Sequence, residues 1–154
     1  MKIERLEHVA ITVKDMDEAR NTWMNVLGIG QEYEEQIGQT KLAMLPVGQT
    51  YIELLSSEGK DSPVNEWMDK NGESIWHLCF EVENIDEAVE ELKAKGVKLR
   101  NEEPMNGHGG SRIVFLDPAS TGNVLIELAE IPRDIKRRAA NKERGRALAS
   151  AASR

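Results

Sequence analysis

The chain has 154 residues, of which 40% are hydrophobic and 31% are charged, and its formal net charge is −7. This length allows one ordinary hydrophobic core and argues against a second full domain. The composition is that of a soluble globular protein, and no apolar run approaches the length of a membrane span. The first residues, MKIERLEH, lack the apolar segment of a secretory signal, so we expect a cytoplasmic protein without a membrane partner.

The negative charge is confined to the body of the chain. Residues 131–154 contain eight Lys or Arg against two Asp or Glu, which leaves residues 1–130 with a formal charge of −13. An acidic body of this kind argues against a nucleic-acid partner. We expect a single domain over residues 1–130, followed by a basic, alanine-rich tail over residues 131–154 that is helical or disordered.

The first predicted elements are a strand and a helix. Alternating apolar residues predict the strand from about Glu4 to Val13, with His8 on one of its faces. Asp17 is positioned to cap a helix that extends to about Val26. The chain therefore begins with a strand–helix unit that carries a histidine in its strand.

A hairpin and a short helix complete the first half. Residues 41–46 and 50–55 are predicted strands, joined by a turn that contains Gly48. Glu53 lies inside the second of these strands. A serine followed by proline then predicts a short helix over residues 62–71.

The central strand is predicted at residues 75–82, which read IWHLCFEV. Alternation puts His77 and Cys79 on one face and the bulkier apolar residues, including Trp76, on the other. Cys79 is the only cysteine of the chain, so no internal disulfide can form. Its position within a strand favours the role of a small buried apolar residue.

A second helix and two more strands follow the central strand. The helix is expected over residues 86–96, and the strands over residues 112–116 and 123–129, on either side of a turn. Glu127 lies inside the last strand, between an isoleucine and a leucine, as Glu53 does in the first half. The second half thus repeats the order of the first.

Two stretches of sequence show that this repetition is internal duplication. HVAITVKDMDEA begins at His8, and HLCFEVENIDEA begins at His77 with the same spacing. Such self-similarity indicates two copies of one structural unit. The sequence predicts an α+β protein of two tandem βαβββ-type modules, the first over about residues 1–58 and the second over about 74–130, with a linker over about 59–73.

One histidine and one glutamate recur at equivalent positions of the two modules, namely His8 with Glu53 and His77 with Glu127. A carboxylate on a buried strand face is costly unless a positive charge lies beside it. Taken singly, each residue is better explained without a metal, as a hydrogen-bonded core histidine or as a glutamate that points to solvent at a sheet edge. The repeated pair favours one divalent metal ion per chain, and two imidazoles with two carboxylates suit cobalt, nickel, manganese, zinc or ferrous iron.

A glycine-rich stretch, NGHGGSR, precedes the strand at residues 112–116. Its simplest interpretation is a flexible surface loop around His108. Its backbone N–H groups are also suited to an anionic ligand, with Arg112 adding positive charge. On this second interpretation Gly109, Gly110 and Arg112 are the predicted substrate-binding residues. No helix follows the loop, so it is not a P-loop.

Four stretches of the chain resemble the vicinal oxygen chelate superfamily, which includes glyoxalases, bleomycin-resistance proteins and dioxygenases. Within it, the greatest similarity is to the methylmalonyl-CoA epimerases, because the STGNVLIEL segment differs from the DPDGY-type turn that is usual in glyoxalase I relatives. Together the stretches cover most of residues 1–130. They are LEHVAITVKDMDEA, DSPVNEWMDKNG, HLCFEV and EEPMNGHGGSRIVFLDPASTGNVLIEL.

The resemblance implies a curved, mostly antiparallel sheet around a metal held by His8, Glu53, His77 and Glu127. Cobalt is the expected ion, with nickel, manganese or zinc as alternatives. The implied activity is that of an isomerase that removes the proton next to a thioester and interconverts the stereoisomers of methylmalonyl-CoA, or of a close acyl-CoA, through an enolate. Glu127 is the expected catalytic base, and the protein is expected to form a homodimer.

Two residues depart from the family pattern. Some epimerases have a glutamate, thought to be a second base, where this chain has Leu42. The second base is therefore open, with Glu53, Lys41 or a water molecule as candidates. Trp76 stands where the family often has another histidine, and strand alternation places it on the face away from His77.

Two other functions are compatible with this sequence. A glyoxalase I-like lactoylglutathione lyase uses the same kind of metal site and similar proton chemistry. A metal-free small-molecule-binding protein of the same fold usually lacks this set of ligands. A ring-cleaving dioxygenase is disfavoured, since it uses two histidines and one carboxylate, whereas Glu53 adds a fourth ligand here.

Overall fold

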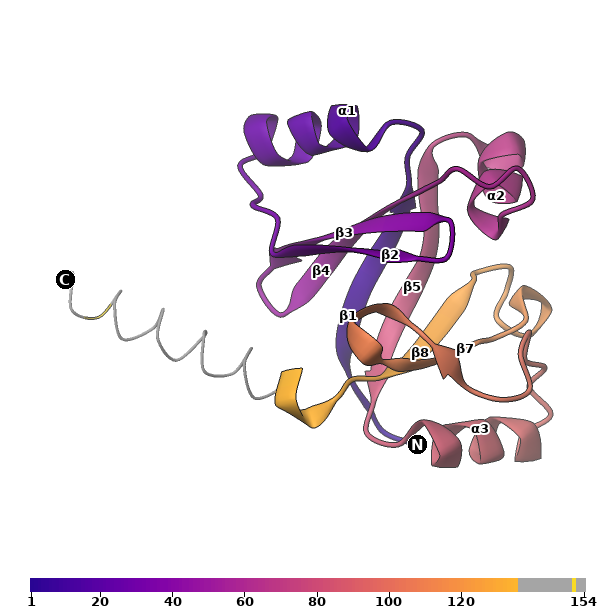
Figure 1. Ribbon diagram of the computed structural model, residues 1–154. Helices are drawn as coiled ribbons and strands as arrows, with labels where there is room; N and C mark the ends of the chain where they lie inside the picture. The colour runs from indigo at the N-terminus through magenta and orange to yellow at the C-terminus, as the bar shows by residue number, and fades with distance from the viewer. Residues whose placement is uncertain (136–150, 152–154) are drawn as a thin grey trace.

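The computed structural model describes residues 1–135 and residue 151 (Figure 1). The prediction made for the basic tail falls almost entirely outside these residues. Within the described part of the chain, no helix is both long and apolar enough to cross a membrane. The elements that position the candidate site all lie within the first 130 residues.

The order of elements in the described residues is repeated once. Each half begins with a long strand and a helix and ends with three strands, and one further helix links the halves. A π-helical segment at residues 21–26 extends the first helix, and 3-10 turns lie at residues 108–110 and 118–120. The strands are β1 (Ile3–Thr12), β2 (Tyr33–Ile37), β3 (Thr40–Val47), β4 (Thr50–Ser57), β5 (Ser74–Val82), β6 (Met105–Asn106), β7 (Arg112–Phe115) and β8 (Ile126–Glu130), and the helices are α1 (Met16–Arg20), α2 (Pro63–Asn71) and α3 (Ile85–Ala94).

All eight strands belong to one sheet with the order β2-β3-β4-β1-β5-β8-β7-β6. At its centre β1 and β5 run antiparallel, while β1 pairs in parallel with β4 and β5 pairs in parallel with β8. Figure 1 shows the two halves curling on either side of this central pair, with α1 beside one half and α3 beside the other. The predicted α+β class, with two similar modules and a curved, mostly antiparallel sheet, is confirmed.

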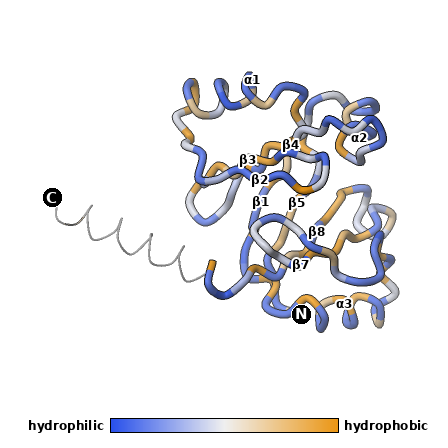
Figure 2. The backbone as a smooth tube through the Cα atoms, viewed as in Figure 1, coloured by the Kyte–Doolittle hydropathy of each residue, from blue (hydrophilic) through white to orange (hydrophobic). Residues whose placement is uncertain are grey.

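The two faces of the sheet pack against different elements. On the outer face, α1 covers Ala43 and Leu45 in the first module, and α3 covers Val114 and Leu128 in the second. On the inner face, Val64 of α2 packs in a cluster of the first module. Figure 2 shows hydrophobic stretches along these strands, with hydrophilic residues in many of the turns. The predicted start of α2 at Ser62 and Pro63 is confirmed, and the Ser62 hydroxyl caps the helix by accepting a hydrogen bond from the N–H of Asn65.

The pairing of β1 with its neighbours brings equivalent residues of the two modules together on the inner face. In each module, the residue two positions after the histidine is small. Ala10, in the first module, lies opposite His77 on one side and Glu53 on the other. Cys79, in the second module, lies opposite His8 and Glu127. The two rows across the sheet are Glu53, Ala10 and His77, and then His8, Cys79 and Glu127.

Two bulges turn the residue before each histidine toward the inner face. The pairing of β1 with β5 shifts register beside His8 and again beside His77. Glu7 is consequently buried together with His8, and Trp76 packs against the inner-face cluster that contains Ala10. The expectation that Trp76 faces away from His77 is therefore wrong, because a bulge breaks strict alternation.

The first module contains a strand, β2, that the sequence pattern does not single out. Its sequence YEEQI is polar, because it forms an edge of the sheet and pairs only with β3 among the described strands. The helix starts also differ from those expected. Asp15, rather than Asp17, caps α1, since its carboxylate accepts hydrogen bonds from two backbone N–H groups of the first turn. Asn84 caps α3, and its side-chain oxygen accepts one hydrogen bond, from the N–H of Glu87.

Candidate metal centre

The structure brings His8, Glu53, His77 and Glu127 together on the inner face, and we refer to them as the ligand cluster. His8 Nε2 lies 3.1 Å from His77 Nε2, 3.1 Å from Glu53 Oε2 and 4.0 Å from Glu127 Oε2. His77 Nε2 lies 2.9 Å from Glu127 Oε2 and 3.9 Å from Glu53 Oε2. None of the four residues is more than 4% exposed, so the cluster is shielded from bulk water.

The five separations given above, each of which involves a histidine nitrogen, are short enough for a single metal ion. Two donor atoms bound to one ion at about 2.1 Å each can be no more than about 4.2 Å apart, and these separations reach 4.0 Å at most. The atoms of His8, His77 and Glu127 form a group whose members all lie within 4.8 Å of one another, and Glu53 is not a member of this group. Imidazole nitrogens and carboxylate oxygens are ligands that borderline divalent ions accept. The residues present are therefore suited to a divalent cation.

The electrostatics of the ligand cluster call for a positive charge. Burial disfavours the charged form of His8, but its polar neighbours, Glu53 first among them, together outweigh burial and hold the pKa of His8 well above its usual value. Burial likewise raises the pKa of Glu53, yet the histidines around it, His8 first among them, together lower it to about 2. The buried carboxylate of Glu53 therefore stays ionised beside a cation, which is either a proton on the imidazole or a metal ion.

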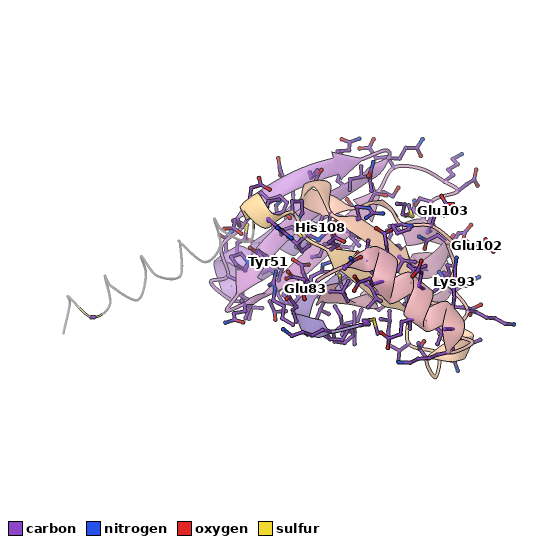
Figure 3. All side chains as sticks on the ribbon, turned by 90° about the horizontal axis from the view of Figure 1, so that it is seen from below. Tyr51, Glu83, Lys93, Glu102, Glu103 and His108 are labelled. Carbon is purple, nitrogen blue, oxygen red and sulfur yellow. The ribbon has the colours of Figure 1, made fainter. Side chains whose placement is uncertain are left out.

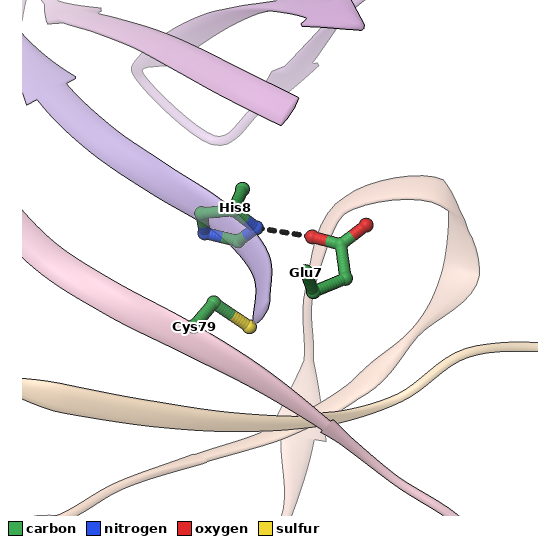
Figure 4. Close-up of side chains that lie close together, drawn as sticks. All are labelled: Glu7, His8 and Cys79. Carbon is green, nitrogen blue, oxygen red and sulfur yellow. Dashed lines mark hydrogen bonds and ion pairs between the residues drawn. The ribbon is translucent and has the colours of Figure 1, made fainter. Parts of the chain in front are cut away.

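Two further buried side chains touch the ligand cluster. Glu7 Oε2 is hydrogen bonded to His8 Nδ1 (Figure 4), and the thiol of Cys79 donates to Glu127 Oε1 across 3.7 Å. Burial, and then the charge of Glu127, hold the pKa of Cys79 well above its usual value, so the thiol keeps its proton. Glu7, His8 and Cys79 also form a possible metal-binding group, but a protonated thiol is a poor ligand. Glu7 and Cys79 are therefore best described as neighbours of the ligand cluster.

The glycine loop, residues 107–111, connects the two modules across the inner face. His108 Nδ1 is hydrogen bonded to the hydroxyl of Tyr33 at 2.8 Å, and the N–H of Gly109 donates to Glu35 Oε2 at 2.8 Å. Both partners belong to β2, at one edge of the sheet, whereas the loop lies between β6 and β7 at the other. These two hydrogen bonds therefore close the curled sheet over its inner face.

His108 is a buried residue of the loop, with 6% of its surface exposed. Figure 3 shows it on the side of the molecule away from Glu102 and Glu103. Its Nε2 lies 3.3 Å from Glu7 Oε2. Burial lowers the pKa of His108, but contact with Glu7 outweighs burial and raises it. The glycine loop thus contacts the ligand cluster through the carboxylate of Glu7. Because His108 is buried, it is not part of a flexible surface loop.

The three predicted substrate-binding residues lie in two different places. Gly109 and Gly110 form the turn of the glycine loop, with φ of 59° and 74°, which glycine adopts without strain. Arg112 lies on the outer face, where its guanidinium makes two hydrogen bonds of 2.7 Å to Asp86 of α3. The structure therefore brings the two glycines, but not Arg112, to the inner face.

The candidates for a second base also lie on different faces. Leu42 is 3% exposed and belongs to the inner-face cluster with Ala10. Lys41, the next residue in the chain, lies on the outer face, and its ammonium group forms an ion pair of 2.6 Å with Glu58. Directly opposite Leu42, on β2, stands Glu35. A carboxylate is thus present on the inner face one strand further from the ligand cluster.

Three inner-face residues, Glu7, Tyr33 and Glu35, are missed by sequence reasoning. Strict alternation puts Glu7 on the opposite face from His8, and only the bulge brings both side chains inward. In β2, half-buried and exposed residues alternate, and Tyr33 and Glu35 are the half-buried ones. They stand two positions apart in the sequence, which is the spacing of residues on one face of a strand. That spacing is the signal that points to an inner-face pair.

The comparisons with known proteins identify the family of the chain. Residues 7–115 match the family model described as the glyoxalase/bleomycin resistance protein/dioxygenase superfamily. The mitochondrial methylmalonyl-CoA epimerase of Bos taurus is 37% identical over 129 residues, which cover 82% of this chain and 74% of that protein. The ethylmalonyl-CoA/methylmalonyl-CoA epimerase of Cereibacter sphaeroides is 35% identical over 133 residues, covering 84% of this chain and 99% of that protein.

Solved structures show the same fold. The methylmalonyl-CoA epimerase of Mycobacterium tuberculosis has a TM-score of 0.82 at 31% identity, covering 87% of this chain and 92% of that one. A variant of the Streptomyces coelicolor methylmalonyl-CoA epimerase, in complex with 2-nitronate-propionyl-CoA, has a TM-score of 0.81 at 30% identity and covers 84% of this chain and 96% of that one. The resemblance noted in the sequence is thereby confirmed.

Proposed function

The chain belongs to the glyoxalase/bleomycin resistance protein/dioxygenase superfamily, and within it we propose that the chain is an epimerase that interconverts the stereoisomers of methylmalonyl-CoA or a close acyl-CoA. The observation that carries this proposal is the convergence of two histidines and two glutamates, one pair from each module, on the buried inner face. Relatives named as methylmalonyl-CoA epimerases match over most of the chain, and structures of such enzymes with acyl-CoA ligands share its fold.

The ligand cluster holds one divalent ion in this proposal. When bound, the ion acts as a Lewis acid that stabilises negative charge on the thioester oxygen as the neighbouring proton leaves. The protein residues keep the site dry, because none of the four ligands is more than 4% exposed. The histidines supply neutral nitrogen ligands, and the carboxylates of Glu53 and Glu127 balance the charge of the ion.

Glu127 is the proposed base for one face of the substrate. Its Oε2 faces His77 at 2.9 Å, and its Oε1 accepts a hydrogen bond from Cys79. A carboxylate held in this way is oriented before the substrate arrives, which favours proton transfer at a fixed carbon atom. Because the site is buried, water does not compete strongly for the proton.

Inversion requires that a proton return from the opposite face, and for this step we propose Glu35. Lys41 lies on the outer face, paired with Glu58, so it does not face the ligand cluster. Leu42 offers no acid–base group. Glu35 stands opposite Leu42 on the inner face and lies in the first module, across the site from Glu127. Its carboxylate binds the N–H of Gly109, so substrate binding at the glycine loop is able to release it.

The remaining parts of the proposal concern the ion, the substrate contacts and the assembly. Cobalt is the proposed ion, with nickel, manganese or zinc as alternatives, since all of them accept this mixture of ligands. The backbone of Gly109 and Gly110 is proposed to contact the acyl-CoA. We also propose a cytoplasmic location. By analogy with the superfamily, we propose that the protein forms a homodimer. Light scattering at micromolar concentration tests the dimer, and a monomer would contradict it.

Solvent-deuterium exchange tests the proposed activity. Methylmalonyl-CoA is incubated in D2O with cobalt-loaded protein or with chelator-treated protein, and the C2 proton is followed by NMR. We expect rapid, metal-dependent loss of the proton signal and racemisation of a single starting stereoisomer. The hemithioacetal of methylglyoxal and glutathione is the comparison substrate. Faster turnover of that hemithioacetal, with no exchange into methylmalonyl-CoA, would replace the epimerase with a lactoylglutathione lyase.

A further inference from the structure

We propose that Glu7 is a positioning residue of the metal centre, which orients His8 and couples it to the glycine loop. The inference rests on the proposed function only in assuming that the ligand cluster binds a metal ion. Glu7 is 2% exposed and contacts three basic side chains. They are His8 at Nδ1, His108 with Nε2 at 3.3 Å, and Arg5 with Nη2 at 3.5 Å.

The hydrogen bond from His8 to Glu7 selects one form of the imidazole. A carboxylate accepts but does not donate, so His8 Nδ1 carries a hydrogen, and in the neutral imidazole that binds a metal Nε2 keeps its lone pair. Nε2 is the atom that lies 3.1 Å from both His77 Nε2 and Glu53 Oε2. Glu7 therefore holds His8 in the tautomer and the ring orientation that a metal ion in the cluster requires.

The two modules differ at this position, which argues that Glu7 has a specific role. Trp76 is the counterpart of Glu7, since each precedes its histidine at a bulge. Trp76 offers His77 only an edge-to-face ring contact, with centroids 5.0 Å apart. Among the described residues, His77 Nδ1 has no hydrogen-bond partner. One histidine of the cluster is thus anchored by a carboxylate, and the other is not.

The burial of Glu7 is explained by its basic neighbours, because burying an unpaired carboxylate costs free energy of folding. The same oxygen atom, Glu7 Oε2, faces both Nδ1 of His8 and Nε2 of His108. Both rings therefore contact one buried carboxylate. His108 belongs to the glycine loop and is also hydrogen bonded to Tyr33. A displacement of the loop is therefore transmitted through His108 and Glu7 to His8.

The test measures metal affinity directly, with Co²⁺ as the probe and a chromophoric chelator as competitor. The variants are Glu7→Ala, Glu7→Gln and, as the matched control from the other module, Trp76→Phe. We expect Glu7→Ala to weaken Co²⁺ binding about 10- to 100-fold, the usual effect of removing an outer partner of a ligand. Glu7→Gln keeps an oxygen acceptor for His8 and should recover part of that loss. Trp76→Phe should remain within about threefold of the wild type, because no hydrogen bond to His77 is removed.

Two additional measurements separate positioning from a general loss of structure. Circular dichroism and thermal melting of the metal-free variants report the fold, and the visible spectrum of bound Co²⁺ reports its ligand environment. A shifted Co²⁺ spectrum in folded Glu7→Gln supports the proposal even if Glu7→Ala does not fold. Wild-type affinity and an unchanged spectrum in folded Glu7→Gln and Glu7→Ala would overturn it, while leaving the proposed epimerase intact. Failure of the wild type to bind any of the proposed ions would overturn the metal centre itself, and this proposal with it.

Discussion

Ala10 and Cys79 occupy equivalent places in the two modules, each two residues after a histidine and each directly opposite the histidine of the other module. Both are fully buried. A small side chain at these places leaves room for the imidazole rings to approach each other in the centre of the sheet. The two residues differ in polarity, since Cys79 donates a hydrogen bond to Glu127, which Ala10 cannot do for Glu53.

This relationship predicts the tolerance of position 79. Cys79→Ala should keep metal binding within about threefold of the wild type, because the equivalent methyl group of Ala10 is already accepted and a thiol–carboxylate hydrogen bond is weak. Cys79→Leu should weaken binding strongly, since a larger side chain in a packed interior costs about 1–3 kcal/mol and displaces His8. Competition titrations with Co²⁺ check both variants. Equal affinities for the alanine and leucine variants would contradict the packing argument.

The second prediction concerns His77 and the number of ions. His77→Ala removes one of two imidazole ligands, and it should reduce bound metal from about one ion per chain to a small fraction of that. The fold should persist, because the packed clusters beneath α1 and α3 do not include His77. Elemental analysis after gel filtration gives the metal content, and circular dichroism reports the fold. Cys79→Ala is the control, and unchanged metal content in His77→Ala would show that the ligand assignment is wrong.

Metal binding should also be visible as added stability. The wild type, stripped by a chelator and then supplied with Co²⁺ at about 100 times its dissociation constant, should gain about 2.7 kcal/mol, because only the folded state holds the four ligands together. The midpoint of thermal unfolding should rise accordingly in the wild type and much less in His77→Ala. An equal rise in both proteins would place the bound ion elsewhere on the chain.

The ligand cluster could be predicted from the sequence because it follows the internal repeat. His8 and His77 begin matched stretches, and Glu53 and Glu127 lie in matched Ile-Glu-Leu segments, so spacing alone paired them. The curved sheet followed from the same repeat and from the family resemblance. The ligand cluster and the sheet could be predicted because each depends on a short sequence pattern that occurs once in each module.

The parts that escaped prediction depend on irregular pairing or on contacts between distant segments. Bulges beside the histidines bring Glu7 and Trp76 to the inner face, whereas strict alternation would place both side chains on the outer face. The position of Glu35 depends on the edge strand β2, whose polar sequence resembles a loop. Arg112 was expected near the substrate because it is basic and follows the glycine loop, yet strand alternation turns it toward Asp86 on the outer face.

Glu127→Gln tests whether this residue transfers a proton in addition to holding the metal. Glutamine preserves the size and an oxygen ligand but removes the basic carboxylate, so metal should be retained at a reduced affinity. Deuterium exchange into methylmalonyl-CoA should fall by a factor on the order of 10² or more. NMR of the C2 proton under saturating metal provides the measurement. Near-normal exchange with metal bound would restrict Glu127 to the role of a ligand.

The last prediction separates proton removal from inversion through two neighbouring glutamates of β2. Glu35 lies on the inner face and binds the N–H of Gly109, whereas Glu34 lies on the outer face and pairs with Arg20. If Glu35 returns the proton to the opposite face, Glu35→Gln should still allow Glu127 to exchange deuterium into one stereoisomer. Inversion of that stereoisomer should then slow by about 10²-fold or more. Glu34→Gln, the matched control, should leave both rates within about twofold.

Single stereoisomers of methylmalonyl-CoA in D2O allow both rates to be followed in one sample, since NMR reports exchange and a stereospecific coupling enzyme reports inversion. In Glu35→Gln, deuterium should therefore enter without loss of optical purity. The converse substitution, Leu42→Glu, places a carboxylate directly opposite residue 35 on the same face. In the Glu35→Gln background it should restore inversion in part, because a base is returned to the same side of the substrate. Equal rates of exchange and inversion in Glu35→Gln, with no gain in inversion from Leu42→Glu, would show that Glu35 is not the second base and leave Glu53 or a water molecule as the second proton carrier.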